Sequence, residues 1–345
     1  MNKPKDEPGL QTILSHCGRN LEASGGYVNV PPYEGSTILH DDMEDLFGRV
    51  DNHLYGDGTA QTYGTDGGPT HEAFYDAMNK LEGGAGTWAF STGLAGCTIP
   101  MMAFLKTGDH MLVTDSVYGP TRQFCEVLLK NFGVEAEFYE PTIGAGIEKL
   151  IRPNTRLIYM ESPGTHTFEM QDVPAIAAVA RKYNIVTMID NTYATPLNFQ
   201  PLKHGVDVVV HSATKYICGH SDVLMSTVTC NEKNWKQVRD VCKMTGQYAS
   251  AQSVYLGLRG LRTLKVRLDA VSVHTRKVVD WLLKREEVKK VIWPAYEKDP
   301  GYRIYKRDYS GPIGLFAFQL QDQYTDVQIN RFMDSFRIGL LVGRI

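Results

Sequence analysis

The chain lacks the features expected of a membrane protein, a secreted protein or a metalloprotein. Its longest apolar stretch, residues 97–105, contains Thr98 and Pro100 and is far shorter than the roughly 20 residues of a membrane-spanning helix. Residues 1–9 are charged and have no apolar core, so we expect no signal peptide. The six cysteines form no C-x-x-C pair and the ten histidines form no H-E-x-x-H motif. We therefore expect a cytoplasmic protein with reduced cysteines, no metal site and no membrane partner.

The chain also lacks a strong charge of either sign. A formal net charge of −3 provides no field that would attract nucleic acid. Apolar residues at 43% and charged residues at 22% are typical of a globular protein, and 345 residues are too many for one small core. The basic cluster Arg259, Arg262, Lys265 and Arg267 has helical spacing, which predicts a solvated helix face.

The order of short apolar runs and amphipathic segments predicts an α/β fold. Residues 1–62 are rich in Gly, Asn, Asp and Pro and indicate an extended arm. In residues 63–256, strands alternate with helices, which favours a mostly parallel sheet covered on both faces. Residues 257–345 indicate a smaller α+β domain, with a helix over 262–285 and strands over 288–292 and 314–320. In the larger domain we expect strands over 111–114, 134–139, 157–160, 185–189 and 206–210, and helices over 94–105, 121–131 and 174–183.

Polar groups follow several of these strands where each strand ends. In doubly wound sheets, ligands collect at the carboxyl ends of the strands. Each residue alone has an ordinary explanation, such as a turn, a surface charge or a core aromatic ring. The residues expected at this edge are Gly93, Tyr118, Glu161, Asp190, Ser212, Thr214 and Lys215.

As a set, these residues match the needs of pyridoxal phosphate (PLP). The helix N-terminus at Gly93 and Leu94, with the hydroxyls of Ser212 and Thr214, would bind the phosphate. Asp190 would pair with the pyridine nitrogen, a charge-assisted contact worth about 1.5–3 kcal/mol. Tyr118 would cover the ring, and Lys215 would bond to the aldehyde.

Five ordered motifs resemble the Cys/Met-metabolism PLP enzymes, which have fold type I. The likeness runs from about Tyr63 to Phe336, most of the chain. Tyr63-Gly64 with Gly68-Pro69-Thr70 resembles the arm of the β-lyase branch, and Thr165 stands where γ-lyases and γ-synthases usually carry asparagine. The motifs are Tyr-Gly-Pro-Thr (118–121), Glu-Ser-Pro-Gly (161–164), Met-Ile-Asp-Asn-Thr-Tyr (188–193), Ser-Ala-Thr-Lys-Tyr (212–216) with Gly-His-Ser-Asp (219–222), and Gly-Leu-Arg-Thr-Leu (260–264).

The resemblance implies a carbon–sulfur β-lyase that cleaves cystathionine to homocysteine, pyruvate and ammonia. It assigns Lys215 to the Schiff base and to proton transfer, Asp190 to the ring nitrogen and Tyr118 to ring stacking. It further implies a homotetramer built as a dimer of dimers, in which Tyr63 reaches the phosphate of a neighbouring subunit. A γ-lyase or γ-synthase with the same residues is an alternative.

Two departures from the family pattern raise a third possibility. Thr65 stands where the family's arm usually has an arginine for the phosphate, and Asp66 follows it. After Phe336 the chain reads Arg337-Ile338-Gly339-Leu340-Leu341-Val342-Gly343-Arg344-Ile345, in place of the family's Ser-x-Gly-Gly-x-Glu-Ser stretch and its carboxylate-binding arginine. Nothing assigns Arg344 to that role. We therefore expect a truncated C-terminal domain, and a PLP-binding remnant of low activity is the further alternative.

Overall fold

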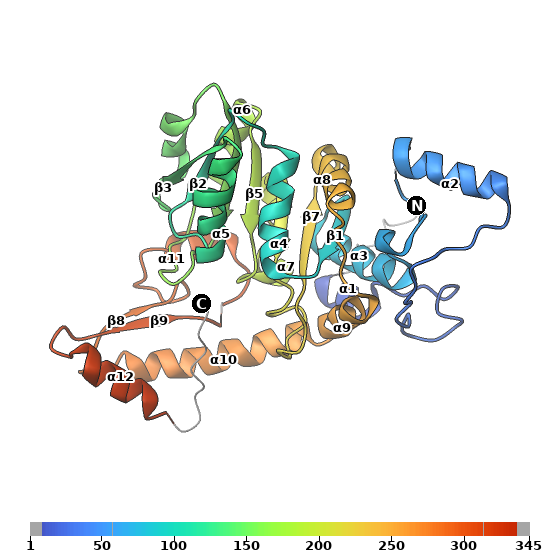
Figure 1. The fold of residues 1–345 in the computed structure, drawn as a ribbon. Coiled ribbons are helices and arrows are strands. Elements are labelled where there is room, and N and C mark those ends of the chain that lie inside the picture. Colours follow the sequence, from blue (N-terminus) through green and yellow to red (C-terminus); the bar gives the residue numbers. More distant parts are fainter. Residues whose placement is uncertain (1–8, 57, 313, 337–345) are drawn as a thin grey trace, which may run out of the picture.

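A mixed seven-stranded sheet forms the centre of the molecule in the computed structural model, which describes residues 9–56, 58–312 and 314–336 (Figure 1). Six strands are parallel, and β7 runs antiparallel to both of its neighbours. The predicted mostly parallel α/β fold is therefore confirmed. In spatial order the strands are β1 (Gly86–Phe90), β7 (Ser226–Cys230), β6 (Val208–His211), β5 (Val186–Asp190), β4 (Thr155–Glu161), β2 (His110–Thr114) and β3 (Glu135–Tyr139).

Helices cover both faces of this sheet because its central strands are apolar on both sides. In β6, Val208 and Val210 pack into one hydrophobic cluster and Val209 into another, as the alternation of side chains along a strand requires. The first face carries α4 (Gly93–Thr98), α5 (Gly119–Gln123) and α8 (Glu232–Met244), and the second carries α6 (Val173–Lys182), α3 (Pro69–Glu82), α7 (Thr195–Asn198) and α9 (Ala251–Leu261).

Two of the predicted helices are less regular than expected. The helix expected over 94–105 is α4 followed by a 3-10 segment, Ile99–Ala103, with Pro100 at its start. Proline has no N–H for the α-helical bond at this point. The helix expected over 121–131 is α5 followed by a π-helical segment, Phe124–Leu129.

The N-terminal segment contains two helices that its weak periodicity did not predict. Leu14 of α1 (Leu10–His16), with Cys17 and Val30, is buried in a core cluster against α3. None of the residues of α2 (Met43–Tyr55) is buried, and this helix projects away from the sheet (Figure 1). The segment is therefore part core element and part projecting arm.

The C-terminal part forms a smaller α+β unit, as the sequence predicts. Its strands β8 (Val288–Ile292) and β9 (Ala317–Leu320) are antiparallel, and the second is shorter than the 314–320 expected. Trp293, Val279 and Leu282 centre its own hydrophobic cluster. Its helices are α10 (Leu264–Leu282), α11 (Tyr302–Asp308) and α12 (Asp326–Asp334). Residues 337–345, including Arg344, lie outside the described residues.

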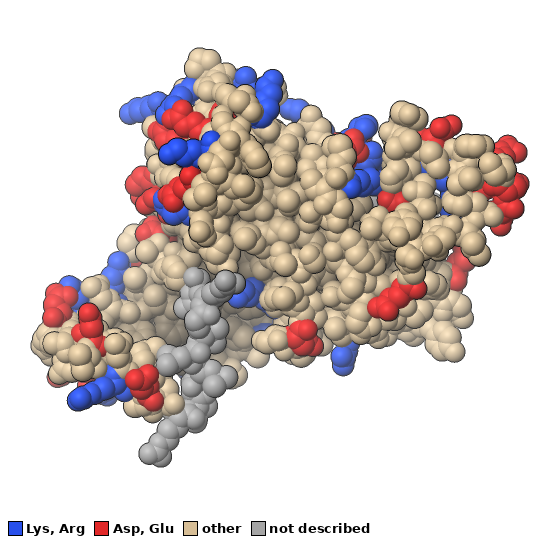
Figure 2. All heavy atoms as spheres, in the orientation of Figure 1, with Lys and Arg blue, Asp and Glu red and all other residues tan. Residues whose placement is uncertain are grey.

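The described part of the chain has no helix with both the length and the apolar character needed to cross a bilayer. All six cysteines are buried free thiols. On the face shown in Figure 2, acidic and basic side chains are intermixed near the periphery, and the middle of the face carries few charges.

Candidate active site at the carboxyl edge of the sheet

The carboxyl ends of three adjacent strands bring the central predicted residues together. Glu161 and Asp190 are the last residues of β4 and β5, and they face each other in the strand register. The next strand, β6, ends at His211, so Ser212 begins the segment that leads to Lys215. The acid and the lysine segment therefore lie on adjoining strand ends, as expected for this edge.

Asp190 is nearly buried, and a short chain of hydrogen bonds connects it to the lysine segment. Its Oδ1 accepts hydrogen bonds from the backbone N–H of Thr192 at 2.9 Å and from the Thr192 hydroxyl at 2.5 Å. The same hydroxyl accepts the N–H of Ser212 at 2.8 Å. On the other side, the Cys97 thiol of α4 donates to Asp190 Oδ2 at 3.4 Å. The carboxylate is therefore held in one orientation by two separate elements.

The start of α4 and Ser212 form a cradle with unused donors. The backbone amides of Gly93 and Leu94 and the Ser212 hydroxyl have no hydrogen-bond partner among the described residues. A Cβ at position 93 would lie 2.5 Å from Ser212 Oγ, so a larger residue there would force the serine hydroxyl out of its present position. Amides at a helix start and a nearby hydroxyl are suitable donors for a phosphate group.

Thr214 differs from Ser212, although the sequence predicts the same role for both. Its hydroxyl donates to the carbonyl of Met225 at 3.1 Å and accepts the Met225 N–H at 3.0 Å. Its single proton is therefore already used to hold the loop, and Ser212 is the better placed donor of the two.

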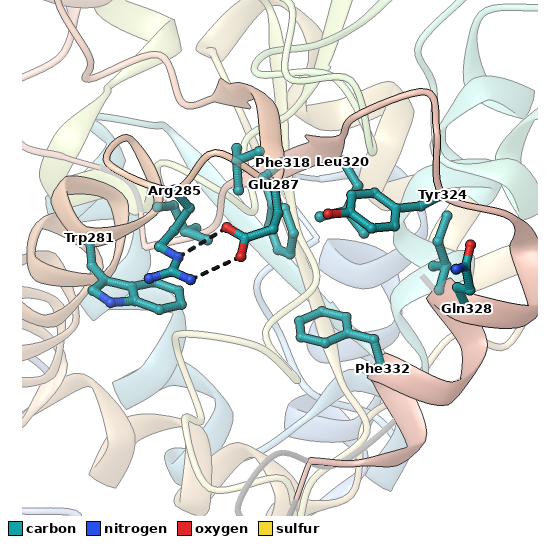
Figure 3. A pocket seen from close by; sticks show the side chains of 11 residues that line it. Trp281, Arg285, Glu287, Phe318, Leu320, Tyr324, Gln328 and Phe332 are labelled. Atoms are coloured by element: carbon teal, nitrogen blue, oxygen red, sulfur yellow. Dashed lines mark hydrogen bonds and ion pairs between the residues drawn. The ribbon is translucent and has the colours of Figure 1, made fainter.

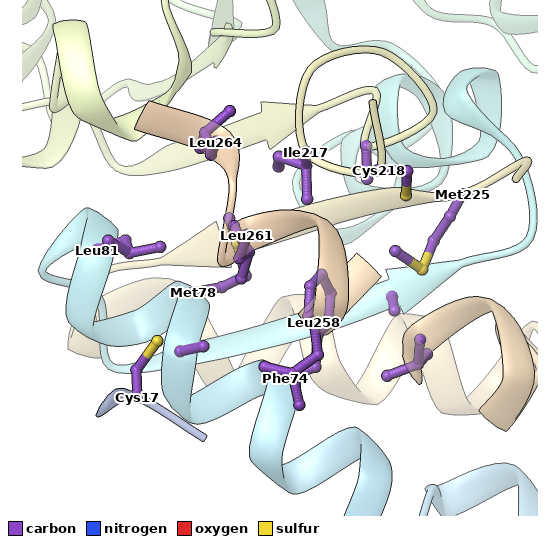
Figure 4. Packing of buried hydrophobic residues seen from close by; sticks show 14 of the residues in the cluster. Cys17, Phe74, Met78, Leu81, Ile217, Cys218, Met225, Leu258, Leu261 and Leu264 are labelled. Atoms are coloured by element: carbon purple, nitrogen blue, oxygen red, sulfur yellow. The ribbon is translucent and has the colours of Figure 1, made fainter. Parts of the chain in front are cut away.

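The backbone around Lys215 is held firmly, whereas its side chain is exposed. Ile217 and Cys218 are buried against residues of α3 and α9, including Phe74 and Leu258 (Figure 4). The Lys215 amine has no hydrogen-bond or ion-pair partner in the described ranges. The structure thus presents a free amine on a fixed turn.

Two arginines of the predicted solvated face hold backbone carbonyls instead, so that prediction was wrong for them. Arg267 donates to the carbonyls of Tyr216 at 2.6 Å, Ile217 at 3.3 Å and Gly260 at 2.9 Å. Arg262 donates to the carbonyls of Leu14 and Cys17, both at 2.6 Å. Helical spacing alone could not reveal this, because the acceptors in residues 14–17 and 216–217 are distant from the arginines in the sequence.

Tyr118 reaches the same edge through Glu161. Its backbone N–H donates to Glu161 Oε2 at 2.8 Å, and its side chain is half-buried. Glu161 is 3% exposed. Burial and the neighbouring Asp190 raise the pKa of Glu161 to about 8, although the hydrogen bonds from Thr165 and Tyr118 oppose this shift.

The residues predicted from the arm motif lie in a separate turn. Tyr63 is 52% exposed, and its backbone N–H donates to Asp66 Oδ2 at 3.1 Å. The same oxygen accepts the N–H and the hydroxyl of Thr62 and lies 3.4 Å from His53 Nδ1. The Asp66 carboxylate therefore closes its own turn. The role of Tyr63 toward a neighbouring subunit stays a prediction.

A cavity of about 310 Å³ lies in the smaller unit, away from this edge (Figure 3). Apolar side chains of α10, β8, β9 and α12 line it, and a salt bridge of Arg285 with Glu287 stands beside them. None of the predicted site residues contributes to its lining, so we do not assign the chemistry to it.

Sequence reasoning missed three residues that organise the site: Cys97, Thr192 and Arg267. Thr192 lies within a quoted motif, and its place two residues after a strand-end aspartate is a usable signal for a local turn. Cys97 and Arg267 gave no such signal, because their contacts join segments far apart in the sequence.

The chain is similar to known proteins in both sequence and fold. Residues 11–342 match the family described as Cys/Met metabolism PLP-dependent enzyme. A Rhizobium johnstonii protein, provisionally named cystathionine beta-lyase, is 42% identical over 96% of this chain and 82% of its own. The cystathionine beta-lyase of Haemophilus influenzae is 39% identical over 95% of this chain and 83% of its own. The crystal structure of a cystathionine gamma synthase from Xanthomonas oryzae pv. oryzae superposes with a TM-score of 0.89 at 26% identity, covering 98% of this chain and 84% of that one.

Proposed function

The chain belongs to the Cys/Met-metabolism PLP-dependent enzymes, and we propose that it is a carbon–sulfur β-lyase that cleaves cystathionine to homocysteine, pyruvate and ammonia. The observation that carries this proposal is the link from Asp190 through Thr192 to the Ser212 backbone. It sets an acid, a phosphate-type cradle and a free lysine on neighbouring strand ends.

The residues present fit pyridoxal phosphate. The unused donors at Gly93, Leu94 and Ser212 suit its phosphate, and Asp190 suits its ring nitrogen. Lys215 would hold the group covalently, and Tyr118 would cover the ring. When bound, the cofactor supplies an electron sink for the electrons released as a bond to the substrate Cα breaks.

The chain's own groups supply the proton transfers. With the cofactor in place, Lys215 would be the group that moves protons at this edge, since its amine has no competing partner among the described residues. The same amine can return its proton to the leaving sulfur. General acid–base transfer of this kind contributes about 10²–10⁴-fold. Asp190 would hold the ring nitrogen, and its hydrogen bonds with Thr192 and Cys97 fix the direction of the carboxylate.

We also propose a cytoplasmic homo-oligomer, with the arm of residues 1–62 serving a neighbouring subunit. The apolar side chains of α2 support this idea, since Met43, Phe47 and Leu54 are each more than half exposed to solvent. In this proposal residues 63–256 bind the cofactor, residues 257–345 form the smaller C-terminal domain, and Tyr63 reaches the neighbour's phosphate.

The second candidate is a γ-lyase or γ-synthase, favoured by the close superposition on a cystathionine gamma synthase. Product analysis with cystathionine separates the two. The β-lyase yields pyruvate, which lactate dehydrogenase and NADH detect directly. A yield of 2-oxobutyrate with no pyruvate would overturn the β-lyase proposal and leave the family assignment intact.

A further inference from the structure

We propose that Glu161 is a positioning residue that fixes two parts of the site at once: the Tyr118 segment on the cofactor side and the Thr165 turn on the substrate side. This inference rests on the function proposed above. Glu161 has no assigned role in the chemistry, yet it lies in the register position beside Asp190 with almost no exposure to solvent.

Three contacts connect the segment after β2 to the turn after β4. The Tyr118 N–H donates to Glu161 Oε2 at 2.8 Å, and the Thr165 N–H donates to the Ser116 carbonyl at 2.8 Å. Between them, Gly164 packs so closely that a Cβ would lie 2.2 Å from Ser116 Oγ. Only the first of these contacts is made by an ionisable side chain.

Both carboxyl oxygens of Glu161 are used, one for each segment. Oε2 accepts the Tyr118 amide, and Oε1 is hydrogen-bonded to the hydroxyl of Thr165, a residue that is 9% exposed. A buried group bonded at both ends cannot turn without leaving a polar atom unpaired, which is costly in an interior. Glu161 therefore ties the backbone position of Tyr118 to the side chain of Thr165.

The surroundings of Glu161 favour its neutral form. The ionisable groups that interact with it are Asp190 on β5, Cys97 on α4, Tyr159 on β4 and Tyr193 in the segment after β5. None of them is cationic. The Tyr118 N–H and the Thr165 hydroxyl donate to the two carboxyl oxygens of Glu161. A glutamine keeps an oxygen for the Tyr118 amide and offers an N–H to the oxygen of the Thr165 hydroxyl, so both contacts can survive the change.

Because Glu161 contacts both Tyr118 and Thr165, it connects the part of the site that covers the cofactor ring with the turn after β4. Tyr118 precedes α5, and the direction of its ring depends on the backbone that Glu161 holds. Thr165 lies in the turn after β4 and is hydrogen-bonded to Glu161, which stands beside Asp190 at the same edge of the sheet. A change at Glu161 should therefore disturb ring stacking and substrate binding together.

The test compares four forms of the cofactor-loaded enzyme with the wild type: Glu161→Gln, Glu161→Leu, Thr165→Val and the Glu161→Gln/Thr165→Val double variant. The readouts are the visible circular dichroism of the bound cofactor, kcat and KM. Glu161→Gln should keep the dichroism and stay within about threefold of wild-type kcat/KM, because both bonds survive. Glu161→Leu should lose much of the dichroism and at least about tenfold in kcat/KM, since each lost buried hydrogen bond is worth roughly that factor. Glu297→Gln, at an exposed position, is the matched control.

Thr165→Val keeps the proposal testable even where Glu161→Leu does not fold. Valine removes the partner of Oε1 from glutamate and from glutamine alike, so Thr165→Val should lose dichroism and about tenfold in kcat/KM, and adding Glu161→Gln should cost no more there than in the wild type. Wild-type dichroism and kinetics in Thr165→Val or in Glu161→Leu would overturn the positioning role. Borohydride trapping of the cofactor on Lys215 in every folded variant shows that the proposed function stands; its failure in the wild type would instead refute that function.

Discussion

The buried carboxyl of Glu161 predicts a specific pH dependence of stability. In the folded, cofactor-free protein, burial and Asp190 raise the pKa of Glu161 from 4.5 to about 8. Between these values the folded state keeps a proton that the unfolded state has lost, so stability falls as the pH rises. Each pH unit in this window costs about 1.4 kcal/mol, and the loss reaches about 3 kcal/mol at pH 7.

Glu161→Gln removes this proton equilibrium and keeps the shape of the neutral side chain. The difference in unfolding free energy, variant minus wild type, should therefore rise by about 1.4 kcal/mol per pH unit between pH 5 and pH 7.5. Urea unfolding of both cofactor-free proteins, at one protein concentration and several pH values, measures the difference. Titrating groups that do not interact with Glu161 cancel in this comparison.

The control is Glu297→Gln, an exposed glutamate whose replacement should leave the difference from wild type flat across this range. Parallel pH curves for wild type and Glu161→Gln would refute the reasoning, because they would mean that Glu161 ionises in the folded protein as readily as in the unfolded chain.

Three further changes test the site itself. Asp190→Asn should leave the cofactor bound and lower kcat by roughly 10- to 100-fold, because a charge-assisted bond worth about 1.5–3 kcal/mol is lost; unchanged steady-state kinetics would count against the pairing. Gly93→Ala places a Cβ 2.5 Å from Ser212 Oγ and should weaken cofactor binding at least about tenfold. Titration of the cofactor-free protein with the cofactor measures the affinity. An unaltered affinity would show that the phosphate does not bind at Gly93 and Ser212. In Arg267→Lys, the lysine cannot bind three carbonyls at once, so the free energy of unfolding should fall by about 1–3 kcal/mol in urea unfolding. Wild-type stability would show that the turn carrying Lys215 does not depend on Arg267.

The regular part of the fold was readable from the sequence because its strands are unbroken apolar runs. The strands after Ile185 and Val206 are buried on both faces, and they end within one residue of the prediction. β1 and β7 were missed because Gly86–Phe90 and Ser226–Cys230 mix small and polar residues with apolar ones. Their burial depends on pairing with each other, which a local pattern does not record.

The candidate site was predictable where its residues follow strand ends, and less so where contacts cross the fold. Asp190, Ser212 and Lys215 could be placed at one edge because parallel strands share it. Thr214 bonds to Met225, and Arg267 bonds to the carbonyl of Tyr216 next to Lys215. Both contacts join segments that come together only when the chain folds. The weak periodicity of the first 60 residues likewise hid α1, whose Leu14 is buried by tertiary packing rather than by helical propensity.

The most direct test of the account is reduction of the cofactor-loaded protein with borohydride, followed by peptide mass spectrometry. The account predicts a reduced pyridoxyl group on Lys215 and loss of the visible absorption band, with no labelling in Lys215→Ala. A label on another lysine, or none on a protein that turns over cystathionine, would contradict it.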